Sequence, residues 1–453
     1  MKKLKNFLFV GLLAVSFPVW GQSSSAIAEY TVSCFSPKTI VRTWGNYAVS
    51  YVRESGSGYL YLTDITEMPV SVSPTVYGYL GTKLPLFSSD AEVDDIQILN
   101  DKVFFCGSYQ GSVAIYGWVS LPFISSSQIH FYFVINATKF KQMVVYKGVT
   151  STKLVAIGED YPAPPITYTK DVIVEIDDAE SNSPSGSLYE LPYNNNQRRE
   201  CLYDIVLTDD YVVFLGHDTD ADVSLCTRWA SRNNISGTIQ NRYDYTLPQD
   251  EVHSKLLATV VDSAEWIAIS YVHVESGTDY TTRTRVIDVN MPHAIQYSQE
   301  YVIANKTYPY ELSYNSTKRI LTVLQNCVAP QDESKFRLLD PFATVDYLFN
   351  TLYYPDLEFT SLCQFDKNRY VATGTNNLLT SKFWYAQDLT STLSSTMSCP
   401  YLFKEKASIQ TSPSVRFNPQ NTRQNTPFVI PSINSFLAPQ ILAPLICNIP
   451  SNK

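Results

Sequence analysis

The stretch from Asp95 to Gly107 reads DIQILNDKVFFCG, and the stretch from Asp204 to Gly216 reads DIVLTDDYVVFLG. The two segments align without a gap, and six of their thirteen positions are identical. In each segment two apolar runs flank a short polar turn, which is the pattern of a β-hairpin. Their displacement of 109 residues is twice a unit of about 54 residues, and a repeat of roughly this length indicates a stacked or radial array.

Weaker copies of the second apolar run occur before, between and after these hairpins. Successive copies are 50 to 58 residues apart. They are Asn46–Tyr51, Lys153–Gly158, Trp266–Tyr271, Arg319–Leu324 and Arg369–Gly374. Together with the two hairpins they make seven units, which account for most of the chain.

Each unit is predicted to hold four strands separated by polar turns. In the second unit the predicted strands are Asp95–Leu99, Lys102–Gly107, Ser112–Val119 and Gln128–Ile135. In the fifth unit they are Leu256–Val261, Trp266–Val274, Thr281–Val289 and Ala294–Val302. Tyr, Val, Ile and Thr are abundant, which favours strands over helices.

Four antiparallel strands repeated seven times predict an all-β fold, a seven-bladed β-propeller, over residues 28–410. The repeat pattern resembles the seven-bladed β-propeller class of exported bacterial proteins. The chain has no WD dipeptide, kelch Gly-Gly pair or Asp-box, so no characterised subfamily is indicated. We expect the strand-like Ala28–Phe35 to close the ring as the outermost strand of the last blade. It would lie beside strands near Phe383–Gln387 and Tyr401–Ile409.

The first 21 residues have the composition of a secretory signal peptide. Three lysines precede the apolar run Asn6–Trp20, and Gly21 supplies a small residue before a predicted cleavage at Gln22. A membrane-spanning helix needs about 20 apolar residues, and Pro18 and the polar residues after Gly21 interrupt this run too early. We therefore expect an exported protein, periplasmic, on the cell surface or secreted, without a transmembrane segment in its mature chain.

Eight cysteines follow the signal segment, at wide and irregular spacings. Export permits disulfides, and Cys399 with Cys447 is the pair to test. Cys106 and Cys226 stand in apolar strands, where a thiol behaves as a small hydrophobic side chain.

Residues 411–453 form a separate C-terminal segment by composition. The segment is rich in Pro, Asn, Ser and Gln and carries few charges. Its apolar runs Phe428–Ile430 and Ile441–Ile446 are unsuited to a fully solvated tail. Packing across the propeller is slightly favoured over docking on a partner.

No local motif indicates catalysis, a cofactor or a metal. The formal charge of −9 argues against nucleic-acid binding. The five histidines form no HxH or HExxH pattern, and the GxSxG and phosphate-loop patterns are absent. Asp218–Asp222 has the DxDxD spacing of a calcium loop, but Val223 and Trp229 stand where an EF-hand needs Gly and Glu. A solvated turn is the favoured interpretation.

The candidate ligand-binding residues come from inner strands and from one long loop. Asp95 and Asp204 open the innermost strands of units two and four and are expected to face the central channel. There they could act as acid and base or bind a cation. A turn-capping or channel-solvating role is favoured, because the two blades are not neighbours and the equivalent positions of other units are Thr259 or apolar.

Three tyrosines complete the set. Tyr189 and Tyr193 lie in the polar stretch Asp177–Arg199, which is predicted to be an exposed loop, and Tyr310 enters the inner strand of unit six. Tyrosine rings on a rigid scaffold can stack on a sugar or contact a peptide.

These features favour a non-catalytic binding or scaffold module that recognises a glycan or a protein through one propeller face. Two alternatives stay open: a glycosidase or polysaccharide lyase with a site in the channel, or a structural component of the cell envelope.

Overall fold

The two quoted stretches each fold as a hairpin at the inner edge of a sheet. In the first, β6 (Ala91–Leu99) pairs antiparallel with β7 (Lys102–Tyr109). The turn residues Asn100 and Asp101 have φ angles of 47° and 56°, the left-handed conformation that tight hairpin turns require. β8 (Val113–Ser120) and β9 (His130–Val134) extend the sheet outward in the order β6-β7-β8-β9. The four strands predicted for the second unit are confirmed.

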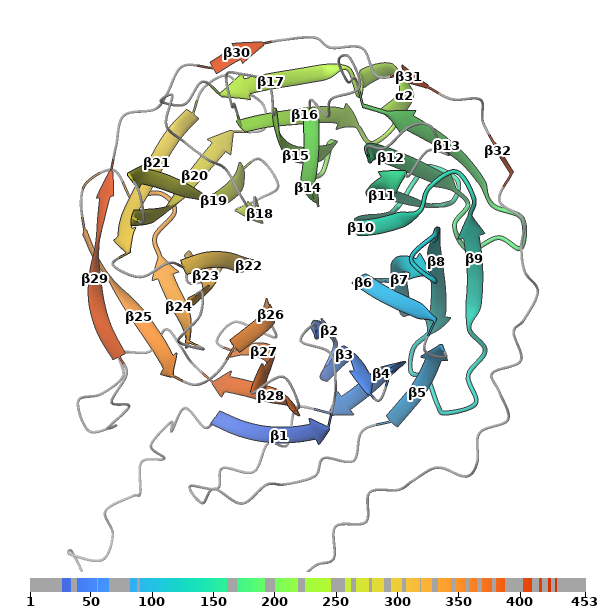
Figure 1. The fold of residues 1–453 in the computed structure, drawn as a ribbon, viewed down its shortest axis with the longest axis horizontal. Coiled ribbons are helices and arrows are strands. Elements are labelled where there is room, and N and C mark those ends of the chain that lie inside the picture. Colours follow the sequence, from blue (N-terminus) through green and yellow to red (C-terminus); the bar gives the residue numbers. More distant parts are fainter. Residues whose placement is uncertain are drawn as a thin grey trace, which may run out of the picture.

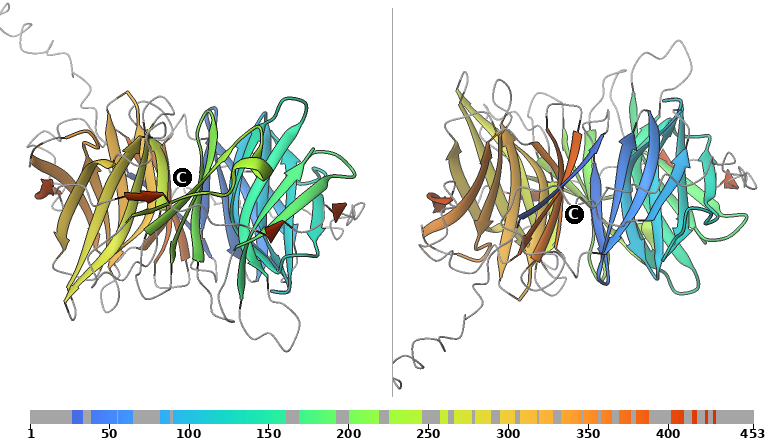
Figure 2. Two further views of the ribbon diagram at one scale, coloured as in Figure 1. Left: turned by 90° about the horizontal axis from the view of Figure 1, so that it is seen from above. Right: turned by 90° about the horizontal axis from the view of Figure 1, so that it is seen from below.

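The chain forms an all-β propeller in this computed structural model, with antiparallel sheets arranged in a ring (Figure 1). The strands run between the two faces of the ring (Figure 2). The first sheet consists of β2 (Ile40–Trp44), β3 (Tyr47–Glu54), β4 (Ser57–Asp64) and β5 (Thr82–Phe87). The third begins with β10 (Lys139–Lys147), β11 (Thr152–Asp160), β12 (Lys170–Asp177) and β13 (Ser185–Glu190). The fourth begins with β14 (Glu200–Leu207), β15 (Tyr211–Asp218), β16 (Leu225–Ser231) and β17 (Asn241–Tyr245), with the short helix α2 (Ile235–Thr238) before β17.

The structure describes residues 27–33, 39–54, 56–64, 82–87, 90–160, 169–191, 200–218, 225–245, 257–261, 266–276, 279–288, 295–303, 307–317, 319–327, 333–343, 345, 347–355, 358–364, 369–376, 380–387, 402–409, 415–417, 423–424 and 428–429. The predicted signal peptide lies outside these residues, as do Cys399 and Cys447.

The described strands form six sheets where the sequence predicts seven blades, and the difference arises in one nine-stranded sheet. One half is β18 (Leu257–Val261), β19 (Trp266–Ser276), β20 (Asp279–Asp288) and β21 (Ile295–Ile303). The other half is β22 (Thr307–Asn315), β23 (Ile320–Cys327), β24 (Glu333–Leu339) and β25 (Tyr347–Pro355). β29 (Leu402–Ile409) pairs with the outer strands β21 and β25 of both halves and so joins them.

The N-terminal strand closes the ring, as predicted. β1 (Ile27–Ser33) pairs along its full length with β28 (Thr380–Gln387), outside β27 (Arg369–Asn376) and β26 (Glu358–Gln364). The expectation that a strand near Tyr401–Ile409 joins this sheet is wrong, because that segment is β29 and pairs with β21 and β25 instead.

Three short strands of the C-terminal segment pair with outer strands of the propeller. β30 (Val415–Phe417) pairs with β17, while β31 (Arg423–Gln424) and β32 (Phe428–Val429) pair with β13. For these residues the preference for packing within the chain is confirmed.

Buried apolar side chains form layers between neighbouring sheets. Phe104 and Tyr132 of the second sheet pack with Met143 and Ala156 of the third. Because each sheet is covered on both faces, its central strands are apolar on both sides, and six consecutive residues of β7 are buried. This two-sided burial explains a long chain with few charges.

A β-bulge in the inner strand explains the glycine that closes the quoted stretches. The register shifts between Val93 and Asp95 in β6 and between Leu202 and Asp204 in β14. The bulged backbone approaches the second strand so closely that a Cβ on Gly107 would lie 1.9 Å from the Glu92 carbonyl oxygen. A Cβ on Gly216 would lie 2.3 Å from the Cys201 carbonyl oxygen. Only glycine fits without moving backbone.

Replacing this glycine tests the close approach. Gly216→Ala should lower the free energy of unfolding by about 2–3 kcal/mol, because the clash is with backbone and cannot be relieved by a side-chain rotation. Gly148→Ala is the milder comparison, since its Cβ would lie 3.0 Å from the Ser151 carbonyl oxygen, a tight contact that a shift of a few tenths of an ångström relieves. Chemical denaturation of both variants measures the difference. Equal losses would contradict the steric explanation.

Candidate functional site

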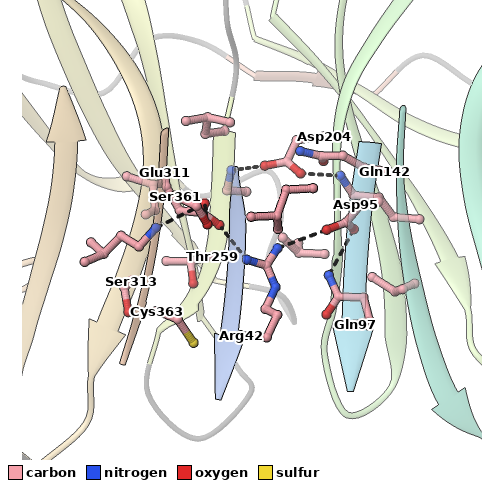
Figure 3. A pocket seen from close by; sticks show the side chains of 18 of the residues that line it. Arg42, Asp95, Gln97, Gln142, Asp204, Thr259, Glu311, Ser313, Ser361 and Cys363 are labelled. Atoms are coloured by element: carbon pink, nitrogen blue, oxygen red, sulfur yellow. Dashed lines mark hydrogen bonds and ion pairs between the residues drawn. The ribbon is translucent and has the colours of Figure 1, made fainter. Parts of the chain in front are cut away.

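A cavity of about 510 Å³ occupies the central channel, lined by the innermost strands β2, β6, β10, β14, β18, β22 and β26 (Figure 3). Its polar lining comes from corresponding positions of these strands. In five of them the residue directly after the β-bulge lines the cavity: Asp95, Gln142, Asp204, Glu311 and Ser361. Arg42 of β2 and Thr259 of β18, strands without a bulge, line it beside them.

Among these residues that line the cavity, called the polar ring below, Arg42 lies between two carboxylates. Its Nη2 is 3.0 Å from Asp95 Oδ1 and its Nη1 is 3.4 Å from Glu311 Oε1. Nη1 also donates to the Val41 carbonyl oxygen at 2.9 Å. Burial opposes the charge on Arg42, but Glu311 and Asp95 raise the pKa of its guanidinium, which stays protonated. One cation therefore links β2 to β6 on one side and to β22 on the other.

The remaining carboxylate oxygens accept hydrogen bonds from the next sheet along the ring. Asp95 Oδ2 accepts from the Met143 N–H at 3.2 Å, and Asp204 Oδ2 accepts from the Ala258 N–H at 2.6 Å. Glu311 Oε2 accepts from the Ser361 hydroxyl at 2.9 Å. Each bond thus joins an inner strand to its neighbour.

A second set of hydrogen bonds is donated by the backbone N–H groups of residues at the β-bulges. Leu202 N–H donates to Asp171 Oδ2 at 2.9 Å, and Phe359 N–H donates to Ser334 Oγ at 2.9 Å. Val93 N–H donates to the Tyr51 hydroxyl at 3.4 Å. In all three cases the acceptor comes from the preceding sheet, so the bulges are held by contacts between sheets.

Burial sets the protonation of the carboxyls in the cavity. It raises the pKa of Asp204 from 3.8 to about 8, against two backbone N–H donors that favour the charged form. Burial also raises the pKa of Glu311, although Arg42 and the Ser361 hydroxyl act in the opposite direction. The ion pairs of Arg42 that Figure 3 marks lead to Asp95 and Glu311.

Gln142 has an amide oxygen that the described part of the protein leaves without a hydrogen bond. Within the described residues, its Oε1 is buried and has no hydrogen-bond partner. A buried acceptor without a partner costs about 1–3 kcal/mol, which a ligand donor could recover. Its neighbour Lys141 is committed instead to Glu159 at 2.7 Å and Asp171 at 3.0 Å.

The structure brings together three of the five predicted ligand-binding residues, Asp95, Asp204 and Tyr310, which all line the cavity. Tyr189 does not lie in an exposed loop, because Ser185–Glu190 is strand β13. It is buried there, and its hydroxyl donates to Glu175 Oε2 at 3.1 Å. Tyr193 lies outside the described residues.

The expectation that the equivalents of Asp95 and Asp204 are Thr259 or apolar is wrong. Arg42, Gln142, Glu311 and Ser361 also point toward the channel. The register of the inner hairpin is the signal that identifies these positions. The first residue after the bulge in the inner strand pairs with the residue just before the glycine in the second strand. Counting back from Gly158 and Gly374 through this pairing finds Gln142 and Ser361, whereas β23 and β3, the partners of β22 and β2, contain no glycine.

Other sequence-based expectations have mixed outcomes. Cys106 and Cys226 are fully buried, as expected of packed thiols. The ring of His130 is stacked on Trp118, with the ring centroids 3.8 Å apart. The calcium-like run after Asp218 lies outside the described residues. Among the side chains that the structure describes, no group of three could hold a metal ion, and no described helix is long and apolar enough to cross a membrane.

The raised pKa of Asp204 predicts a pH-dependent stability. The folded protein binds the Asp204 proton more tightly than the unfolded chain does. The stability from this group is complete below about pH 4 and falls as the pH rises toward about 8. Relative to Asp204→Asn, the wild type should lose up to about 1.4 kcal/mol per pH unit between pH 5 and pH 8. Urea denaturation across this range measures the difference, and parallel profiles would contradict it.

Removing the central cation should destabilise the ring. Arg42→Met leaves Asp95 and Glu311 without their partner, and we expect a loss of about 2–4 kcal/mol at pH 7, less than for a fully buried pair because Arg42 is 20% exposed. The loss should shrink at lower pH, because burial raises the pKa of Glu311 and its protonation removes a charge that the variant leaves without a partner. Arg42→Lys, which keeps the charge, is the control. Thermal denaturation at pH 5 and pH 7 measures the loss of stability. A loss that is the same at both pH values would contradict the electrostatic role of Arg42.

Comparisons with known proteins identify no family. No protein-family model and no curated protein matches the sequence. Among solved structures, the uncharacterised protein lmo1340 from Listeria monocytogenes EGD-e is similar, with a TM-score of 0.38 and 11% sequence identity. The match covers 75% of this chain and 90% of that one.

Proposed function

We propose that this chain is an exported, non-catalytic binding module whose ligand enters the central cavity, and that the ligand is a glycan. Export is supported by the composition of the first 21 residues. The seven-bladed architecture belongs to the same proposal. It is supported by the apolar layer between the two halves of the nine-stranded sheet, where Val261 and Ala268 pack with Leu321 and Val323.

The observation that carries the proposal is the mixed polar lining of the cavity. Carboxylate, guanidinium, amide and hydroxyl groups converge on one space, with Tyr310 and Tyr314 at its wall. A sugar presents hydroxyls that both donate and accept, so it matches a site with both kinds of partner. Gln142 Oε1 offers the acceptor that lacks a partner within the described residues.

The same geometry argues against catalysis by the carboxyls. Glycoside hydrolysis needs one carboxyl free to transfer a proton and a second free to attack or to activate water. Here Asp95, Asp204 and Glu311 hold their oxygens in bonds to Arg42 and to backbone N–H groups. These carboxyls support the ring before they meet any ligand.

A second candidate, a carbohydrate-active enzyme, is favoured by one observation. With its pKa raised to about 8, Asp204 keeps its proton at neutral pH and has the protonation state of a general acid. Such an enzyme would turn over a polysaccharide, whereas the binding module would not.

A glycan array and a polysaccharide-digest screen of the chain from Gln22 onward test both candidates together. We expect binding without product release. Gln142→Leu should weaken that binding about tenfold, the worth of one hydrogen bond. Gln128→Leu is the matched control, since Gln128 is exposed outside the cavity.

Each of the other outcomes contradicts a specific part of the proposal. Release of product would overturn the non-catalytic function in favour of the enzyme. Binding that Gln142→Leu leaves unchanged would place the ligand outside the cavity. Absence of binding to every glycan would overturn the ligand class.

A further inference from the structure

The C-terminal strands follow the outer rim of the propeller in one direction. β29 pairs with β25 and β21, β30 with β17, and β31 and β32 with β13. From each of these strands to the next, the chain passes to a sheet formed earlier in the sequence. Figure 1 shows the strands in that order around the circumference. The next outer strand in the same direction is β9.

The outer edge of β9 is open within the described part of the chain, where β9 pairs with β8 alone. Large apolar side chains are exposed in the chain segments just before and just after β9. Ile124 in the loop before β9 is 61% exposed, and Ile135 directly after it is 68% exposed. An open edge beside exposed apolar side chains is a site for another strand to add.

The last described tail residues end close to this edge. Val429 lies opposite Ser185 at the start of β13. Four residues earlier, the Ser181 carbonyl oxygen accepts a hydrogen bond of 2.7 Å from the hydroxyl of Tyr132, which belongs to β9. Ser181 and Ser185 are at most about 14 Å apart along the chain. A few extended residues after Val429 therefore suffice to reach β9.

The segment that follows has the chemistry to cover the edge. Residues 430–453 carry a single charged side chain, Lys453, and include the apolar run Ile441–Cys447. Pro444 divides this run, and proline is tolerated on an edge strand, where its missing N–H can face solvent. Short pairings are already the rule on this rim, because β31 and β32 contain two residues each.

We propose that residues 441–447 of this chain pair with the outer edge of β9 and cover Ile124 and Ile135. The tail then continues its course along the rim from β13 to the second sheet. It closes an edge that would otherwise be available for association with other chains. This inference does not depend on a ligand in the central cavity.

Hydrogen–deuterium exchange of the full-length chain tests this proposal. The charged double variant Leu442→Asp/Ile446→Asp should increase amide exchange in residues 128–135 at least tenfold, because Asp cannot lie against the isoleucines. Exchange in β5, on another outer edge, should stay unchanged. The matched control, Ser432→Asp/Asn434→Asp, adds the same charge before the proposed strand and should leave β9 protected.

The outcomes separate the possible occupants of the edge. Near-ultraviolet circular dichroism establishes that the variants keep the native fold, which rim substitutions should not disturb. Unchanged exchange in β9 would overturn the proposal. Protection of β9 that disappears on dilution would also overturn it, because the segment would then come from a second copy.

Discussion

The fold depends on hydrogen bonds that run from one inner strand to the next. The innermost strands of a propeller splay around the channel, so they cannot pair with one another as a sheet does. Their inner N–H groups then need other acceptors, since a buried N–H without a partner costs about 1–3 kcal/mol. Asp95 and Asp204 supply them to Met143 and Ala258. The β-bulge makes this possible by turning the side chain toward the neighbouring strand.

This constraint decides what the polar residues of the channel can do. A carboxylate that caps a neighbouring amide is fixed in position and protected from solvent. It contributes shape and polarity to the cavity, while its oxygens already accept hydrogen bonds from the protein. Arg42 then balances Asp95 and Glu311 and lowers the cost of burying them together. Within the described part of the chain, Gln142 keeps a buried acceptor without a partner, and for this reason the ligand hypothesis depends on this residue.

Local pattern was sufficient to predict the hairpins, because alternating apolar runs and polar turns are short-range features. Asp95 and Asp204 were recognised because their units align without a gap. Glu311 and Arg42 are not predictable in this way, because they face the same channel without the same flanking sequence. Tyr189 was misplaced for a related reason. The polarity of Asp177–Arg199 suggested a loop, whereas β13 needs only six residues of it and buries the ring on Glu175.

The outer rim shows why sheets and packed layers need not correspond one to one. Sheets are defined by hydrogen bonds at strand edges, and β29 bonds to two edges at once. The apolar layers are defined by faces, and one such layer separates β18–β20 from β22–β24 inside the nine-stranded sheet. The repeats in the sequence predict the packed faces of the sheets, because the repeated apolar residues are the buried ones. The edge contacts of β29 and the later strands come from a segment without repeats, which the periodic pattern does not predict.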